Sequence, residues 1–252
     1  MQSSRLPASA LQPALFAGVI AAGLAVDQGF QPWGQAAVDA AVWSLFVALA
    51  WSRRGPERLA LLACLAYASA GELFLSEVLG LYAYREGTIP LFVPPGHVLL
   101  LLLGVGAVRA LPARAWSAVP WAMLPLVAAA AWTGLDPSAP WLFALYLVCL
   151  RFGPSPSLYS AMFVLSLAME VYGVWLGNWT WTAERVFEGP RLHNPPLAAG
   201  AFYCVLDWLV IATRNRFYAS CLSSHSQAAP RTPLESPCAG AASRVSTRSE
   251  KT

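Results

Sequence analysis

The chain has 252 residues, of which 57% are hydrophobic and only 12% are charged. Soluble domains average about 25% charged residues, so this composition excludes an ordinary soluble domain and indicates a polytopic membrane protein. The net charge of +3 comes mostly from arginines in predicted loops and in the C-terminal tail. No basic stripe with interleaved aromatic residues is present, which argues against nucleic-acid binding.

Eight apolar stretches predict membrane-spanning helices, each of which needs about 20 mostly apolar residues. In chain order they cover about 11–30, 35–51, 57–82, 90–110, 116–134, 138–151, 157–181 and 195–213. The second and sixth are short, so six or seven spans remain alternatives. The first stretch could also be a signal peptide, but no Ala-x-Ala cleavage site precedes a soluble domain, and we predict a first membrane helix.

The arginines define a consistent topology for eight spans. The arginines at the ends of the even-numbered spans all fall on one side of the membrane, which is the cytoplasmic side by the positive-inside rule. They are Arg53, Arg54, Arg58, Arg109, Arg114, Arg151, Arg214 and Arg216. The opposite loops, which hold Arg85, Arg185 and Arg191, also hold Glu86, Glu184 and Glu188. The predicted fold is therefore an all-α, polytopic membrane helix bundle with both termini in the cytoplasm. We expect it in the inner (cell) membrane of a bacterium, with the lipid bilayer as its surroundings.

An internal repeat agrees with this topology. A shift of about 97 residues aligns spans one to four with spans five to eight. This predicts two parallel four-helix repeats, over about 11–111 and 112–216, within a transmembrane domain formed by 1–218. From about Ala219 the composition changes to Ser, Pro, Ala and Arg, so 219–252 are predicted to be a disordered cytoplasmic tail.

The most informative feature is a motif that occurs once in each half. Glu72 precedes the segment Gly-Leu-Tyr-Ala-Tyr at 80–84, and Glu170 precedes Gly-Asn-Trp-Thr-Trp at 177–181; a Pro-Pro pair follows each. An interfacial belt of Trp and Tyr explains the aromatic residues but not the acid before them. Because a carboxylate in hydrocarbon costs about 2.5–3.5 kcal/mol, two acids in matching surroundings indicate a function.

The depth of these acids predicts their chemistry. Glu72 lies twelve residues before Tyr84, roughly 18 Å along a helix, and Glu170 lies at nearly the same depth. A low-dielectric environment favours the uncharged form of a carboxylic acid. Such an acid can act as a general acid, or it can form a structural hydrogen bond between helices. Asp207, deep in the eighth span, is expected to be the partner of one of them. Glu72, Glu170 and Asp207 are the candidate catalytic residues.

Other residues near the motifs are candidates for substrate binding. The face of an aromatic ring stabilises a nearby cation by roughly 0.5–2 kcal/mol. His97 and His193 are candidates because they flank the two Pro-Pro pairs. The candidates are Glu77, Tyr82, Tyr84, His97, Trp175, Trp179, Trp181, His193 and Asn194. Histidines and carboxylates can hold a metal, but the chain has no CxxC and lacks the His boxes of membrane di-iron enzymes. We expect neither a metal nor a cofactor.

The acid, the Gly-x-aromatic-x-aromatic segment and the Pro-rich helix start, occurring twice, resemble a group of membrane isoprenoid enzymes. These are the carotenoid hydratases of bacteria and archaea, the small-subunit type of lycopene cyclase, and the membrane terpene cyclases. The resemblance covers about 35 residues in each half; where the cyclases often carry Pro-x-Glu-Glu, this chain has Pro-Pro-Gly-His at 94–97. It implies an enzyme that protonates an alkene or epoxide of an apolar isoprenoid with a buried carboxylic acid, leading to cyclisation or hydration.

Two other classes of function remain open. Parallel repeats with acids near the bilayer midplane are also found in proton-coupled transporters. A non-catalytic accessory or structural membrane protein could use the two glutamates only to lock helices together. Glu72→Gln distinguishes these possibilities, because it abolishes protonation chemistry, uncouples a carrier from pH and leaves a purely structural hydrogen bond nearly intact.

Overall fold

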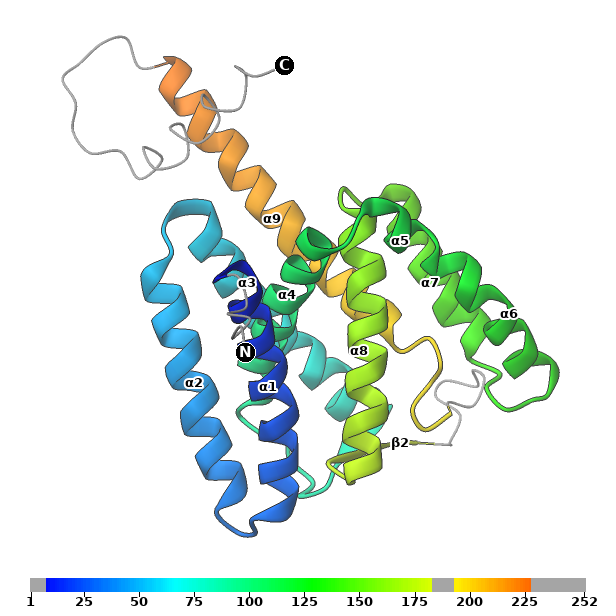
Figure 1. The fold of residues 1–252 in the computed structure, drawn as a ribbon. Helices are drawn as coiled ribbons and strands as arrows, with labels where there is room; N and C mark the ends of the chain where they lie inside the picture. The colour runs from blue at the N-terminus through cyan, green and yellow to red at the C-terminus, as the bar shows by residue number, and fades with distance from the viewer. Residues whose placement is uncertain (1–7, 183–192, 228–252) are drawn as a thin grey trace, which may run out of the picture.

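The computed structural model describes residues 8–182 and 193–227, which form a mostly helical bundle with one small sheet (Figure 1). The elements are α1 (Ala8–Gly29), α2 (Gly34–Ser52), α3 (Gly55–Glu72), the π-helix η1 (Leu73–Val78), β1 (Tyr82–Tyr84), α4 (Val93–Ala110), α5 (Ala113–Ser117), α6 (Val119–Trp132), α7 (Ala139–Phe152), α8 (Pro156–Leu176), β2 (Trp179–Trp181) and α9 (Gly200–Gln227). Each predicted span overlaps with one helix or with two consecutive helices.

Five of these helical segments are long and apolar enough to cross a membrane: α2, α3 with η1, α4, α5 with α6, and α8. The helix α7 is apolar but shorter. Bulky apolar side chains cover the outside of the bundle, including Val78 (67% exposed), Trp121 (75%) and Trp132 (92%). Such a surface suits lipid rather than water, in agreement with the predicted membrane protein. The total of eight spans, the repeat and the side of the termini stay predictions.

Four helices, α3, α4, α8 and α9, form the centre of the bundle. α3 and α8 each pack against both α4 and α9. On one side α1 packs against α4 and α2 against α1; on the other side α7 packs against α9 and α6 against α7 (Figure 1). The backbones of α8 and α9 approach closely at Gly200, where a Cβ atom would collide with the backbone of Phe163. The central four helices therefore enclose the interior in which the candidate acids lie.

The helix ends differ from the predicted span boundaries. The predicted spans 57–82 and 157–181 extend too far, because the helices end at Val78 and Leu176. A glycine with a positive φ angle follows each end, Gly80 at 61° and Gly177 at 83°, a conformation that commonly terminates a helix. At the other boundary, α9 continues to Gln227, so the helical part extends past the predicted start of the tail at 219. Residues 228–252 lie outside the described part.

The small sheet was not predicted and corrects the purely helical expectation. β1 and β2 pair antiparallel, with Tyr82 opposite Trp181 and Tyr84 opposite Trp179. Since alternate residues of a strand point to the same face, the four aromatic side chains lie together on the buried face, and the residues between them are exposed. The sheet thus joins the two sequence motifs directly, over the ends of α3 and α8.

Candidate functional site

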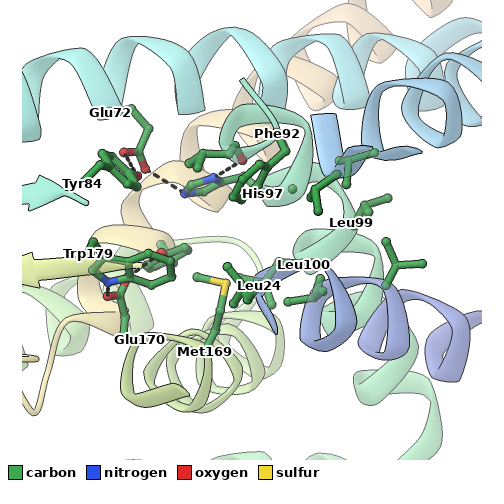
Figure 2. A pocket seen from close by; sticks show the side chains of 18 of the residues that line it. Leu24, Glu72, Tyr84, Phe92, His97, Leu99, Leu100, Met169, Glu170 and Trp179 are labelled. Atoms are coloured by element: carbon green, nitrogen blue, oxygen red, sulfur yellow. Dashed lines mark hydrogen bonds and ion pairs between the residues drawn. The ribbon is translucent and has the colours of Figure 1, made fainter. Parts of the chain in front are cut away.

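Glu72 and Glu170 lie inside the bundle and border the same internal space. Each is six residues from the end of its helical segment, α3 with η1 or α8, and their exposed fractions are 7% and 4%. Figure 2 shows Glu72 on the upper side of the pocket and Glu170 on the lower side, with Tyr84 and Trp179 between the two acids. The two acids therefore face a common hollow.

Glu72 accepts hydrogen bonds from two tyrosines of β1. Tyr82 and Tyr84 donate their hydroxyl protons to the same oxygen, Oε2, at 2.7 and 2.6 Å. Burial and, second, the nearby Glu72 carboxyl raise the pKa of both phenols above its ordinary value, so they keep their protons and remain donors. The other oxygen, Oε1, lies 3.4 Å from Nε2 of His97 on α4.

The protonation of His97 can be assigned from its second nitrogen. Nδ1 lies 2.9 Å from the carbonyl oxygen of Val93, which can only accept a hydrogen bond, so Nδ1 carries a proton. In a neutral imidazole Nε2 then presents a lone pair to Oε1 of Glu72. Two lone pairs would repel each other across this contact, so one proton lies between His97 and Glu72. In low dielectric the uncharged arrangement, a neutral imidazole beside a carboxylic acid, avoids burying an ion pair.

Glu170 has a different set of partners. Trp179 and Trp181 of β2 donate their indole N–H groups to Oε2 at 2.7 and 2.9 Å, and Tyr203 of α9 donates to Oε1 at 2.8 Å. An indole N–H can only donate, so Oε2 of Glu170 cannot carry a proton toward either tryptophan. Gly173, one turn beyond Glu170, leaves the space in which the ring of Trp179 lies. The three donors stabilise the carboxylate form of Glu170, whereas its burial favours the uncharged acid.

The connections between helix and strand explain why the two motifs have different spacing. Tyr84 follows Glu72 by twelve residues, whereas Trp181 follows Glu170 by eleven. The helical segment continues six residues past the acid in both halves, as the π-helix η1 in the first and as α-helix in the second. The additional residue lies in the connection, which covers 79–81 in the first half and 177–178 in the second.

Aromatic contacts connect the two halves of the site. The rings of His97 and Tyr203 stack with centroids 5.1 Å apart, which places the partner of Glu72 against the partner of Glu170. Tyr82 packs against Trp181 at 4.8 Å and Tyr84 against Trp179 at 6.1 Å. The site therefore has a continuous aromatic wall between its acids.

Two apolar hollows adjoin the acids. We call the first the inner cavity; it extends toward α1, α2 and α4 and has an empty volume of about 670 Å³, counted to its mouth. The second, the lateral groove, lies mainly between α3 and α9 and has an empty volume of about 1250 Å³ on the same measure. Six residues border both: Glu72, Tyr82, His97, Glu170, Trp181 and Tyr203.

A polar bracket holds the sheet in place above the site. Asp27, at the end of α1, is 1% exposed and accepts hydrogen bonds from Asn178 at 2.7 Å and from Arg85 at 3.3 Å. The backbone N–H of Arg85 also donates to the carbonyl oxygen of Asn178. Because Asn178 precedes β2 and Arg85 follows β1, this bracket fixes both strands to α1.

Asp207 does not pair with either glutamate, contrary to prediction. It is fully buried on α9, but neither carboxyl oxygen has a hydrogen-bond partner among the described residues, and it borders neither hollow. Tyr203, one turn earlier on the same helix, occupies the expected place beside Glu170. Sequence reasoning missed Tyr203, although its spacing of four residues from Asp207 puts both on one helix face.

Four other predicted substrate-binding residues do not border the two hollows. Trp175 is 76% exposed and points away from the interior. Glu77 is also exposed on η1, and its nearest polar partner is the hydroxyl of Ser76 at 3.4 Å. His193 is exposed and contacts the carbonyl of Pro195, while Asn194 accepts a hydrogen bond from the backbone N–H of Trp181. Asn194 thus supports β2 rather than facing a ligand.

Within the described residues, no three His, Cys, Asp or Glu side chains are grouped so that they could hold a metal ion. No protein-family model matches the chain, and no curated protein or solved structure is significantly similar to it.

Proposed function

We propose that the chain is an integral membrane enzyme that protonates a carbon–carbon double bond or an epoxide of an apolar isoprenoid, with Glu72 as the acid. The observation that carries this proposal is the contact of 3.4 Å between Oε1 of Glu72 and Nε2 of His97 beside two apolar hollows. We also propose that the halves are parallel repeats. The antiparallel pairing of β1 with β2 supports this, because a two-fold axis reverses the direction of strands that lie perpendicular to it, and β2 lies across the direction of α8 (Figure 1).

The proposed chemical step transfers one proton from Oε1 of Glu72. For an alkene, the two π electrons form the new C–H bond, the O–H bonding pair stays on Glu72 as a carboxylate, and the neighbouring carbon becomes cationic. The tyrosine donors at Oε2 stabilise the carboxylate that forms. The carboxylate of Glu170 and the faces of Tyr82 and Trp181 lie around the same space and stabilise the cation.

The cation then reacts in one of two ways. In a cyclisation, a second double bond supplies the electrons for a C–C bond and a proton is lost from a neighbouring carbon. In a hydration, water adds to the cation and loses a proton. In both cases the released proton returns to the pair formed by Glu72 and His97, and the enzyme is regenerated without a cofactor.

The lateral groove provides a route for an apolar substrate. Its walls include Phe74 (52% exposed) and Leu209 (46% exposed), which belong to the outer, lipid-suited surface of α3–η1 and α9. An isoprenoid dissolved in the bilayer could pass between these helices to the acids without crossing water. This supports an apolar substrate over a soluble one.

The test uses the purified full chain in detergent with D₂O as solvent. Lycopene and farnesylated aromatic compounds are supplied, and products are analysed by mass spectrometry. We expect a cyclised or hydrated product with deuterium on carbon, and its loss in Glu72→Gln. Glu77→Gln is the matched control, since it makes the same change on the outside of the neighbouring turn. Unchanged substrates throughout the panel contradict the proposal, and products of these alkenes without deuterium on carbon contradict protonation of a double bond.

A proton-coupled carrier is a second candidate, supported by one observation. The same six residues border both the inner cavity and the lateral groove, so a bound molecule could reach the acids from either hollow. Uptake into proteoliposomes that depends on a pH gradient, lost in Glu72→Gln and without chemical change of the cargo, would favour this function.

A further inference from the structure

A third hollow lies at the opposite end of the bundle from the sheet. It is bordered by residues of α3, α4, α8 and α9 and of the two connections α2–α3 and α7–α8, and has an empty volume of about 1040 Å³, counted to its mouth. None of its lining residues borders the inner cavity or the lateral groove. We call it the arginine pocket, because Arg53, Arg109 and Arg214 line it.

The charges of the arginine pocket are only partly balanced. Arg53 forms an ion pair with Glu57 at 3.2 Å, so these two largely compensate each other. Arg214 donates to the neutral side chain of Asn215 at 3.2 Å. Arg109 forms no hydrogen bond or ion pair with any residue in the described part of the chain. Two guanidinium groups therefore remain without a counter-charge at the edge of the pocket.

The remainder of the arginine pocket is apolar. Its walls are formed by leucine and valine side chains, among them Leu101, Leu102, Val105, Leu158 and Val210. A guanidinium group offers paired N–H donors that match a phosphate, while an aliphatic wall matches a hydrocarbon chain. Together they fit one amphiphilic molecule with an anionic head.

We propose that the arginine pocket binds an anionic phospholipid, with its phosphate on Arg109 and Arg214 and one acyl chain along the apolar wall. The chain's own C-terminal segment is a poor alternative occupant. Residues 228–252 carry four basic and two acidic side chains, a net charge of 4 − 2 = +2, which repels the two arginines. This proposal does not depend on the proposed enzymatic function, because no residue of the arginine pocket lines either of the two hollows beside the acids.

The test measures lipid binding to the full-length protein in a non-ionic detergent by native mass spectrometry. Dioctanoyl phosphatidylglycerol is the probe, dioctanoyl phosphatidylcholine is the zwitterionic comparison, and inorganic phosphate is a separate arm. We expect phosphatidylglycerol to bind more tightly than phosphatidylcholine. Arg109→Gln should weaken its binding about fivefold, and Arg109→Gln with Arg214→Gln about 25-fold, since each arginine near an anionic lipid contributes about this factor.

The control is Arg114→Gln, an exposed arginine at the same end of the bundle that does not line the pocket. It should leave phosphatidylglycerol binding unchanged. Inorganic phosphate should compete only weakly, because it lacks the acyl chain. The proposal is wrong if the two lipids bind equally, if Arg114→Gln weakens binding as much as Arg109→Gln, or if inorganic phosphate binds as tightly as the lipid.

Discussion

Glu72 and Glu170 occupy equivalent places below a shared sheet, yet their partners differ in what they can do with a proton. Glu72 has hydroxyl donors at Oε2 and an imidazole nitrogen at Oε1 that can accept and return a proton. At Glu170, two indole N–H groups occupy Oε2 and the Tyr203 hydroxyl occupies Oε1. The backbone frame is common to both acids, and the side chains on it determine which one can be the acid.

This difference changes the expectation from sequence that both acids are uncharged. Two carboxyl groups in different environments can take separate roles. One can donate a proton, while the other stays a carboxylate and stabilises a cation by its charge, which two identical acids cannot do. The following predictions test whether the two acids differ in this way.

The largest effect is expected for the acids themselves. Glu72→Gln should lower turnover at least about 10³-fold, because the amide still accepts from the tyrosines but has no acidic proton. Glu170→Gln should lower it about 10²–10³-fold through the loss of a preorganised negative charge. Product formation in D₂O checks both variants: residual product should carry deuterium in Glu170→Gln. Equal loss in the two variants would contradict separate roles.

A smaller loss is expected for His97, which we propose returns the proton. His97→Gln should lower kcat about 100-fold, because glutamine can hydrogen-bond Glu72 but cannot exchange a proton with it. KM should change little, and the dependence of kcat on pH should shift. Steady-state rates from about pH 5 to about pH 9 provide the measurement. An unchanged pH profile would show that His97 only supports the fold.

The next comparison concerns stability rather than rate. Tyr203→Phe and Tyr84→Phe each remove one buried hydroxyl, and both residues are 8% exposed. A hydrogen bond to a charged group contributes about 1.5–3 kcal/mol and one to a neutral group about 0.5–1.5 kcal/mol. Tyr203→Phe should therefore lower the free energy of unfolding more than Tyr84→Phe, as measured by denaturant titration in detergent. The reverse order would indicate that Glu72 is the charged acid.

The smallest effect is expected outside the site. Trp175→Phe should change the free energy of unfolding, and the activation free energy of turnover, each by less than about 0.5 kcal/mol. The reason is that Trp175 is largely exposed and makes no contact with the acids. The same rate assay and denaturant titration apply. A large loss of turnover would return Trp175 to the substrate-binding set from which the geometry removes it.

The helical framework and the two motifs could be predicted from sequence because both depend on local patterns. Apolar runs of sufficient length locate helices, and the acids stand out within them. The helix ends were predicted less accurately for a local reason, because Gly80 and Gly177 lie between the helices and the aromatic residues. Those aromatic residues form strands of only three residues, which are too short to be recognised from the sequence. The antiparallel pairing of β1 with β2 joins the two halves of the chain, so the sequence of one half alone cannot predict it.

The site partners were harder to predict because depth in a membrane does not determine the direction of a side chain. Asp207 was identified by depth, but it is Tyr203, one turn earlier, that reaches Glu170. Trp175 lies five residues after Glu170, about 140° around an α-helix, so helical geometry alone could have placed it on the outer face. The difference in spacing between the motifs was visible in the sequence, but only the helix and strand bounds show that the additional residue lies in the connection 79–81.

The most direct measurement is infrared difference spectroscopy of the carboxylic-acid C=O stretching band, with wild type compared to Glu72→Gln and Glu170→Gln at neutral pH. Incorporation of ¹³C-labelled glutamate separates these bands from the aspartates. We expect a protonated glutamate band that disappears in Glu72→Gln and persists in Glu170→Gln. Loss of the band in Glu170→Gln alone, or no protonated glutamate in the wild-type protein, would contradict the assignment of Glu72 as the acid.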